Sequence, residues 1–146
     1  MSNFEYIPEG ISLDSHVFYT TEHMFMYVKA CTFKDKEAMQ KIVTAKTPRE
    51  AKEIGRSVKN FNSEVWDLHK YSAMFAVNML KYQASPTLRQ KLLATGNLTL
   101  VEANPRDLIW SCGLSADNPD IFNVSKWTGQ NLLGDVLMQV RKELTL

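Results

Sequence analysis

Residues 20–31 constrain the fold most, because this segment is apolar almost all the way round when it is wound as a helix. At about 3.6 residues per turn, no polar face is left for solvent, so we expect the helix to lie inside the protein. Thr20 or Thr21 is a suitable N-cap for it. The apolar members of the segment are Met24, Phe25, Met26, Tyr27, Val28 and Cys31.

Two charged residues, Glu22 and Lys29, interrupt this apolar segment. Because two helical turns return to the same side with a drift of only ~20°, both side chains project from one stripe. Charges in a buried helix are costly unless they are paired or face a cavity. One interpretation is a structural ion pair, or a Lys29 whose stem extends to solvent. The other is a reaction pocket, in which burial lowers the pKa of Lys29 and raises that of Glu22, giving an amine nucleophile and a proton donor.

The composition indicates one globular domain over residues 1–146, with 45% apolar and 23% charged residues. The net charge of +1 argues against a general nucleic-acid-binding surface, although it is compatible with binding a single nucleotide. Cys31 and Cys112 are too few for a disulfide framework or a zinc site, so we expect reduced thiols in a cytoplasmic protein. Neither a secretory signal nor a membrane-spanning run is recognisable, and no membrane partner is expected.

Cap signals predict a multihelical chain. Thr47-Pro48 and Ser85-Pro86 each place a capping side chain before a proline at the first helical position. Asp35 and Asn62 or Ser63 are further helix starts. The helices are predicted at residues 21–31, 35–45, 48–55, 63–84, 86–94 and 131–144.

The remaining segments predict a small β element and a long loop. Residues 16–19 alternate as a short strand does, and residues 98–103 are the best strand candidate. Residues 104–128 are expected to be irregular, and a loop of that length is more often functional than idle. The predicted fold class is therefore mainly α (α+β), a multihelical single domain with a small β element.

Trp110 is the most informative aromatic residue, because it lies in the predicted loop close to Asp107 and Gly113. An indole can stack on a nucleobase, worth about 1–3 kcal/mol, while a neighbouring carboxylate handles protons or sugar hydroxyls. Core filling is the plainer interpretation of a tryptophan, and it suits Trp127 best. Residues 129–134 set small residues at a helix start, where free N–H groups can receive a phosphate.

Several short motifs follow one another along nearly the whole chain at compatible spacing. They are Ser2-Asn3-Phe4, Glu22-His23 with Lys29, Ala51-Lys52-Glu53-Ile54-Gly55-Arg56, Trp66, Leu92-Leu93-Ala94-Thr95-Gly96, Leu100-Val101-Glu102-Ala103, Asp107 with Trp110, and the closing run from Trp127 through Gly129, Asn131 and Gly134 to Arg141. Each motif alone is weak, but their order resembles that of the NADAR family, the YbiA-like N-glycosidases.

The resemblance implies hydrolysis of N-glycosidic bonds on ribose, with neither a metal nor a cofactor. Members of that family cleave phosphorylated ribosylamino-pyrimidine intermediates of riboflavin synthesis, or remove ADP-ribose from guanine in nucleic acid. Carried over by position, Glu22, Lys29 and Asp107 are the catalytic residues. The residues implied to shape the substrate site are Asn3, Arg56, Trp66, Trp110 and Asn131. For Arg56, a plain solvated side chain after a helix-ending glycine is the alternative.

The chain also departs from the family pattern. It begins at the Ser-Asn-Phe motif, without the strand that usually precedes it, so one edge of the small sheet is expected to differ. Ser111 replaces the glycine that usually follows the loop tryptophan, and Ala30 replaces the usual aromatic residue after the lysine. Residues 115–126 form a longer segment than in compact members.

The expected mechanism joins the charged stripe to the family. A neutral Lys29 attacks the anomeric carbon, the base departs, and water resolves a lysine–sugar Schiff base. Glu22 or Asp107 moves the protons. The alternatives are direct hydrolysis driven by Glu22 alone, a binding module that recognises ADP-ribose or a related nucleotide without cleaving it, and a purely structural helical protein. The near-neutral net charge favours a small ribosylated base over ADP-ribosylated nucleic acid as the partner.

Overall fold

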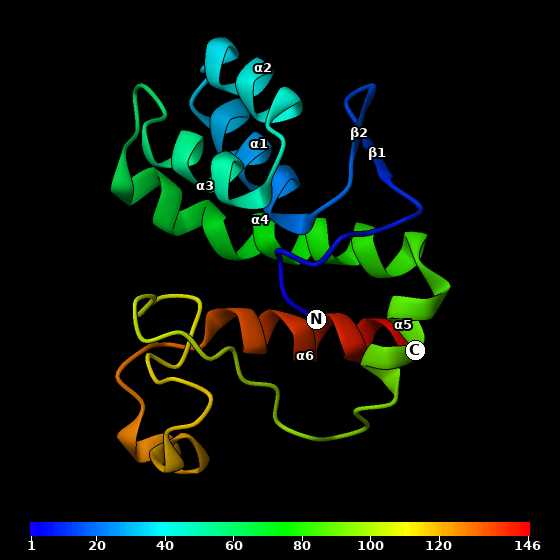
Figure 1. The fold of residues 1–146 in the computed structure, drawn as a ribbon, viewed down its shortest axis with the longest axis vertical. Coiled ribbons are helices and arrows are strands. Elements are labelled where there is room, and N and C mark those ends of the chain that lie inside the picture. Colours follow the sequence, from blue (N-terminus) through cyan, green and yellow to red (C-terminus); the bar gives the residue numbers. More distant parts are fainter. The chain divides into compact units, whose positions relative to one another are not determined.

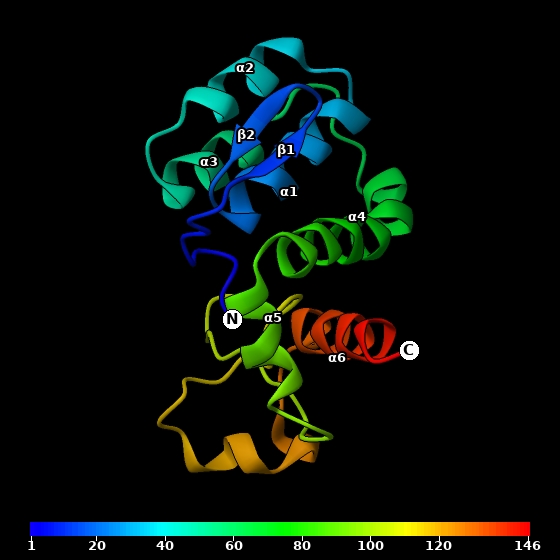
Figure 2. The same ribbon diagram turned by 90° about the vertical axis from the view of Figure 1, so that its right-hand side faces the viewer.

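The computed structural model describes all of residues 1–146, which divide into two compact units, residues 1–90 and 91–146 (Figure 1, Figure 2). The predicted mainly helical fold with a small β element is confirmed, whereas the single domain over residues 1–146 stays a prediction. The elements are β1 (Ile11–Leu13), β2 (His16–Phe18), α1 (Thr21–Thr32), α2 (Lys36–Thr44), α3 (Pro48–Arg56), α4 (Ser63–Ala84), α5 (Pro86–Leu93), two 3-10 helices (Pro119–Phe122 and Val124–Lys126) and α6 (Leu132–Leu144).

Helix α1 is the centre of the first unit, where it packs against α2, α3 and α4 (Figure 1). All of residues 21–27 are buried, which confirms the predicted interior helix. The Thr20 side chain is the N-cap and accepts a hydrogen bond from the His23 N–H. The His23 ring closes the same end, because its Nε2 lies 2.9 Å from the Ala45 carbonyl and its Nδ1 lies 2.6 Å from the Thr20 hydroxyl. A carbonyl oxygen only accepts, so Nε2 carries the proton and Nδ1 accepts from Thr20.

The predicted caps of the next helices are also confirmed. The side chains of Asp35, Thr47 and Asn62 each accept hydrogen bonds from backbone N–H groups in the first turn of α2, α3 and α4. The Ser85 hydroxyl does the same for α5. The observed helix bounds therefore agree with the predicted ones to within a residue or two. None of the helices has the length and apolar content needed to cross a lipid bilayer.

Gly55 lets α3 approach α1 closely. A Cβ atom at this position would overlap with the Met26 sulfur. Glycine inside a helix costs about 1 kcal/mol relative to alanine, and here the close approach of the two helices requires it. The next residue, Arg56, is thereby held beside α1.

The hairpin β1–β2 packs on α1 through one tyrosine. The register pairs Leu13 with His16, so the turn has two residues, Asp14 and Ser15, both with positive φ. That geometry matches the right-handed twist of two short strands. The Tyr27 hydroxyl donates to the Asp14 carboxylate at 3.1 Å. Burial and this carboxylate together raise the pKa of Tyr27 to about 12, so the phenol keeps its proton.

Helix α6 carries the core of the second unit. Its buried face is formed by Leu133, Val136, Leu137 and Val140, and its bounds confirm the helix predicted at residues 131–144. Near its C-terminal end, the Arg141 guanidinium donates to the Thr95 hydroxyl at 2.8 Å and to the Leu98 carbonyl at 2.9 Å.

The predicted strand over residues 98–103 is wrong, because the segment has no partner strand. The Asn131 side chain forms the hydrogen bonds that a partner strand would otherwise make. Its Nδ2 donates to the Leu100 carbonyl at 3.0 Å, and its Oδ1 accepts from the Glu102 N–H at 2.9 Å. Gly134 makes this contact possible, since a Cβ there would overlap with the Leu100 carbonyl and the Asn131 side chain. A β ladder needs a second extended backbone. Residues 98–103 bond to a side chain at the start of α6, so they form no strand.

The expectation of a phosphate at the start of α6 is also wrong. The N–H groups of residues 129–133 donate to carbonyls of the loop at residues 108–112, at 2.8–3.1 Å. Donors that are already bonded to the protein are not free for an anion. The start of α6 therefore holds its own loop in place.

Replacing Gly55 with alanine is expected to lower the free energy of unfolding by about 1–3 kcal/mol, the usual cost of overpacking, because the new methyl group meets Met26. In a Met26→Ala background the methyl group has room, and helix propensity then makes the same change stabilising by up to about 1 kcal/mol. Urea denaturation of the four proteins of this cycle measures both effects. An equal cost in both backgrounds would contradict the contact.

Replacing Asn131 with glycine keeps the positive φ of this residue without strain and removes its side-chain bonds to Leu100 and Glu102. We expect a loss of about 1–3 kcal/mol, the cost of leaving buried polar groups unpaired. Asn131→Ala should cost about 1 kcal/mol more, because alanine disfavours positive φ. Denaturation of both variants measures the difference, and a glycine variant as stable as the wild type would show that these bonds do not matter.

Candidate active site

Glu22 and Lys29 share one side of α1, and the attraction of the carboxylate reaches the amine. Glu22 is only 7% exposed, and Lys29 is half-buried. The Lys29 Nζ lies over two aromatic faces, 4.7 Å from the centre of the Phe61 ring and 5.9 Å from that of Trp66. The amine therefore lies against two aromatic faces, on a side chain that is partly shielded from solvent.

The aromatic wall around the amine comes from three elements. Trp66 on α4 packs against Phe25 of α1 at 5.4 Å between ring centres. Phe33, which follows α1, contacts both Trp66 at 6.3 Å and Phe61 at 5.3 Å. Trp66 was a predicted site residue, whereas Phe33 and Phe61 were not. Phe61 lies in the α3–α4 loop directly before the Asn62 cap. The only sequence feature that could have identified it as a site residue is an aromatic side chain next to a helix cap.

The pKa of Lys29 lies below that of an ordinary lysine. The main cause is burial, because removal of water disfavours the ammonium form. Glu22 acts in the opposite direction and Arg56 in the same direction, since a like charge also disfavours the ammonium. This confirms the predicted lowering of the Lys29 pKa by burial.

Arg56 is the exposed last residue of α3. Its positive charge acts on Lys29 and lowers the pKa of that amine, while its role as a substrate-binding residue stays a prediction. The close packing of Gly55 on Met26 places it near α1. A guanidinium whose charge reaches the Lys29 amine is suited to a phosphate or carboxylate on a ligand.

Asn3 joins the N-terminal segment to the start of α1. Its backbone carbonyl accepts from the Glu22 N–H at 3.0 Å. Its side chain is buried between α1 and α4, where Nδ2 donates to the Met74 sulfur at 3.3 Å. The Oδ1 atom is buried and has no hydrogen-bond partner. An unpaired buried amide oxygen is unusual, and the role of Asn3 in substrate binding stays a prediction.

The second unit places Asp107 and Trp110 in one turn. The Asp107 Oδ1 accepts from the N–H groups of Ile109 at 3.0 Å and Trp110 at 2.9 Å. This aspartate therefore shapes the loop that presents the indole. Trp127 has a structural contact, since its Nε1 donates to the Ile121 carbonyl at 2.9 Å.

Ser111, which stands where the family usually has glycine, is fully buried and cross-links this loop. Its hydroxyl donates to the Asn104 carbonyl at 2.7 Å and accepts from the Asn104 N–H at 2.8 Å and the Gly113 N–H at 2.9 Å. The substitution thus adds hydrogen bonds without blocking the turn.

Within the first unit, the structure brings together most of its predicted site residues. The Trp66 ring and the charges of Glu22 and Arg56 all act on the Lys29 amine, and the Asn3 carbonyl is bonded to the Glu22 N–H. Asp107, Trp110 and Asn131 belong to the second unit. Their roles as a catalytic carboxylate and as substrate-binding residues stay predictions.

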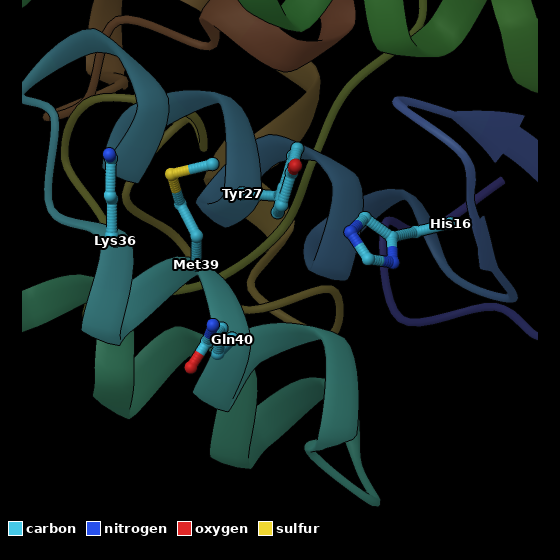
Figure 3. A pocket seen from close by; sticks show the side chains of 5 residues that line it. All are labelled: His16, Tyr27, Lys36, Met39 and Gln40. Atoms are coloured by element: carbon cyan, nitrogen blue, oxygen red, sulfur yellow. The ribbon is translucent and has the colours of Figure 1, made fainter.

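A separate cavity of about 240 Å³ lies on the other side of α1 (Figure 3). Tyr27 lines it, and because Tyr27 and Lys29 are two residues apart they face opposite sides of the helix. Its other lining residues are His16, Lys36, Met39 and Gln40. The walls are mostly apolar and include no carboxylate, so this cavity lacks the acid and amine pair found on the opposite side.

The group around the Lys29 amine supports carbonyl and imine chemistry. A half-buried amine whose pKa is lowered has a larger neutral, nucleophilic fraction than an ordinary lysine. The carboxylate and guanidinium near it can move a proton and bind an anion. No three or more His, Cys, Asp or Glu side chains are grouped so that they could hold a metal ion.

The NADAR domain model matches residues 1–145. The chain is 41% identical to N-glycosidase R617 of Acanthamoeba polyphaga mimivirus over 141 residues, which cover 97% of this chain and 82% of that protein. It is 33% identical to the chloroplastic riboflavin biosynthesis protein PYRR of Zea mays over 132 residues, 86% of this chain and 19% of that protein. The NMR structure of the E. coli protein YbiA matches with a TM-score of 0.74 and 27% identity, over 98% of this chain and 77% of that one. The chain therefore belongs to the NADAR domain family.

Proposed function

We propose that this chain hydrolyses the N-glycosidic bond between ribose and an amino group of a base, through an imine between Lys29 and the sugar. Curated relatives in the same family are named N-glycosidases, and the chain is an enzyme of that class. The single observation that carries the route is the half-buried Lys29 amine with its lowered pKa, enclosed by aromatic rings beside Glu22 and Arg56.

The reaction begins with opening of the ribosylamine. The lone pair of the glycosidic nitrogen forms a C=N bond as the ring oxygen leaves the anomeric carbon and takes a proton. The neutral Lys29 amine then adds to this carbon. The base nitrogen takes a proton and departs with the electron pair of its C–N bond, which leaves a lysine–sugar imine. Water adds to the imine, and departure of the amine releases the sugar, with any phosphate it carries, and restores Lys29.

Glu22 supplies and removes the protons in this scheme. It shares the stripe of α1 with the amine and is almost fully buried, so its proton transfers are sheltered from bulk water. A positioned acid or base contributes about 10²–10⁴-fold to a rate. Asp107 is the second carboxylate assigned to catalysis, and Trp110 and Asn131 are assigned to the substrate.

The substrate is assigned as a phosphorylated ribosylamino-pyrimidine. Its glycosidic nitrogen is an exocyclic amine, as ring opening requires, and its phosphate suits Arg56. The similarity to a protein named for riboflavin biosynthesis supports this class. An ADP-ribosylated guanine would meet the same chemical requirement at the anomeric carbon, and the net charge of +1 favours the small molecule.

Borohydride added during turnover is expected to trap the sugar on Lys29, because reduction converts the imine into a stable amine. Mass spectrometry of the Lys29 peptide detects the adduct, and Lys29→Arg should give neither adduct nor released base. Glu22→Gln should slow base release by about 10²–10⁴-fold. Release at the wild-type rate by Lys29→Arg would contradict the imine route in favour of direct hydrolysis driven by Glu22, and tight binding without release by the wild type would indicate a binding module.

The two charges beside Lys29 are expected to shift its titration in opposite directions. Arg56→Gln removes a like charge and raises the pKa of Lys29, whereas Glu22→Gln removes an opposite charge and lowers it. A higher pKa leaves less neutral amine at pH 7, so the rising limb of kcat/KM against pH moves to higher pH in Arg56→Gln. NMR of ¹³C-methylated lysines measures the pKa without substrate. Shifts of the same sign in both variants would contradict this arrangement.

A further inference from the structure

Phe61 makes the shortest of the ring contacts around the Lys29 amine, at 4.7 Å from Nζ to the ring centre. The ring is 46% exposed, so it contributes little to the core. Yet its inner side is fixed by Phe33, at 5.3 Å between ring centres. Phe61 therefore combines a defined position with an open side towards solvent.

The loop that carries Phe61 is anchored by one carboxylate. Asp35, which is 7% exposed, accepts from the Ala38 N–H at 3.1 Å as the cap of α2. Its second oxygen accepts from the Lys59 N–H at 2.8 Å. These two N–H groups, the one of Lys59 first, hold the pKa of Asp35 below its ordinary value, so the anchor stays charged around neutral pH. The next residue, Asn60, turns the chain with a φ of 62°, and Phe61 follows.

We propose that Phe61 is a positioning residue for Lys29: its ring holds the amine at one place in the pocket and stabilises positive charge there, and Asp35 fixes the ring by anchoring its loop. The contact between Phe61 and Lys29 is observed in the structure. The part of Phe61 in catalysis rests on the proposed function.

The face of an aromatic ring attracts a cation. The resting ammonium and the protonated lysine–sugar imine both carry their positive charge on the same nitrogen, so one ring can serve both states. The charged groups felt by Lys29 are Glu22 from its own helix and Arg56 from α3. The groups that face it from the α3–α4 loop and from α4 are the uncharged rings of Phe61 and Trp66.

The test replaces Phe61 with leucine, which has similar bulk, keeps the amine shielded from water and removes the ring. Phe61→Trp restores a stronger cation–π surface. Phe122→Leu is the matched control, because Phe122 is 91% exposed in the second unit. Urea denaturation confirms that each variant is folded.

Two readouts must change together in Phe61→Leu. The pKa of Lys29, followed by ¹³C-methyl NMR without substrate, falls below that of the wild type because the ammonium loses the ring. The maximal rate of imine trapping falls about two- to five-fold, the factor expected for one cation–π contact. Phe61→Trp restores both, and Phe122→Leu changes neither. An unchanged Lys29 titration in Phe61→Leu, or no recovery in Phe61→Trp, overturns the proposal.

The anchor is tested by a double-mutant cycle, because Asp35→Asn also removes a negative charge. Asparagine has only one acceptor oxygen, so it cannot bind both Ala38 and Lys59 as Asp35 does. If Asp35 acts through the ring, Asp35→Asn lowers the trapping rate in the wild type and has no further effect in Phe61→Leu. Additive effects overturn the role of Asp35.

These experiments separate this inference from the proposed function. If the Lys29 titration responds to Phe61 as described but borohydride traps no sugar in the wild type, the imine route fails and the positioning of the amine stands. If borohydride traps the sugar in the wild type but the pKa of Lys29 does not change in Phe61→Leu, the imine route stands and the positioning role of Phe61 fails.

Discussion

The enclosure of α1 is the constraint on which the rest of the first unit depends. A helix that is apolar on nearly every side has to be covered on nearly every side, and α2, α3 and α4 provide that cover. Lys29 is only partly exposed on such a helix. Its amine ends among Phe61 and Trp66, where the loss of hydration lowers its pKa. The unusual acidity of this lysine follows from how the helix is packed.

Opposing influences meet at the Lys29 amine. Burial and Arg56 favour the neutral form, whereas Glu22 and the two ring faces favour the cation. A nucleophile that adds as a free amine and then carries charge as an imine needs both kinds of neighbour. These neighbours come from separate residues, Glu22, Arg56, Phe61 and Trp66, so each influence can be altered by itself.

Local signals in the sequence were enough to predict much of this fold. Thr20, Asp35, Thr47 and Asn62 cap helices because their short side chains reach the first free N–H groups. The spacing of the two charges in the first helix likewise predicted their common face.

Features that depend on contacts distant in sequence could not be predicted in this way. Residues 98–103 have strand propensity, but a strand needs a partner, and only the fold shows that the Asn131 side chain fills that role. The sequence predicts free N–H groups at the start of α6, but in the fold they donate to carbonyls of the loop at residues 108–112. The contact of Phe61 with Lys29 could not be predicted from the sequence, because the two residues are 32 positions apart and meet only in the folded chain.

The missing side chain of Gly55 has a consequence for how enzymes of this kind can diverge. The close packing of Gly55 on Met26 brings the end of α3, with Arg56, near the helix that carries Lys29, and the charge of Arg56 acts on that amine. A methyl group gained or lost at that crossing would therefore retune reactivity without touching any ligand. Natural variation could adjust the working pH of the catalyst from the interior of the scaffold, with the residues that meet the substrate left unaltered.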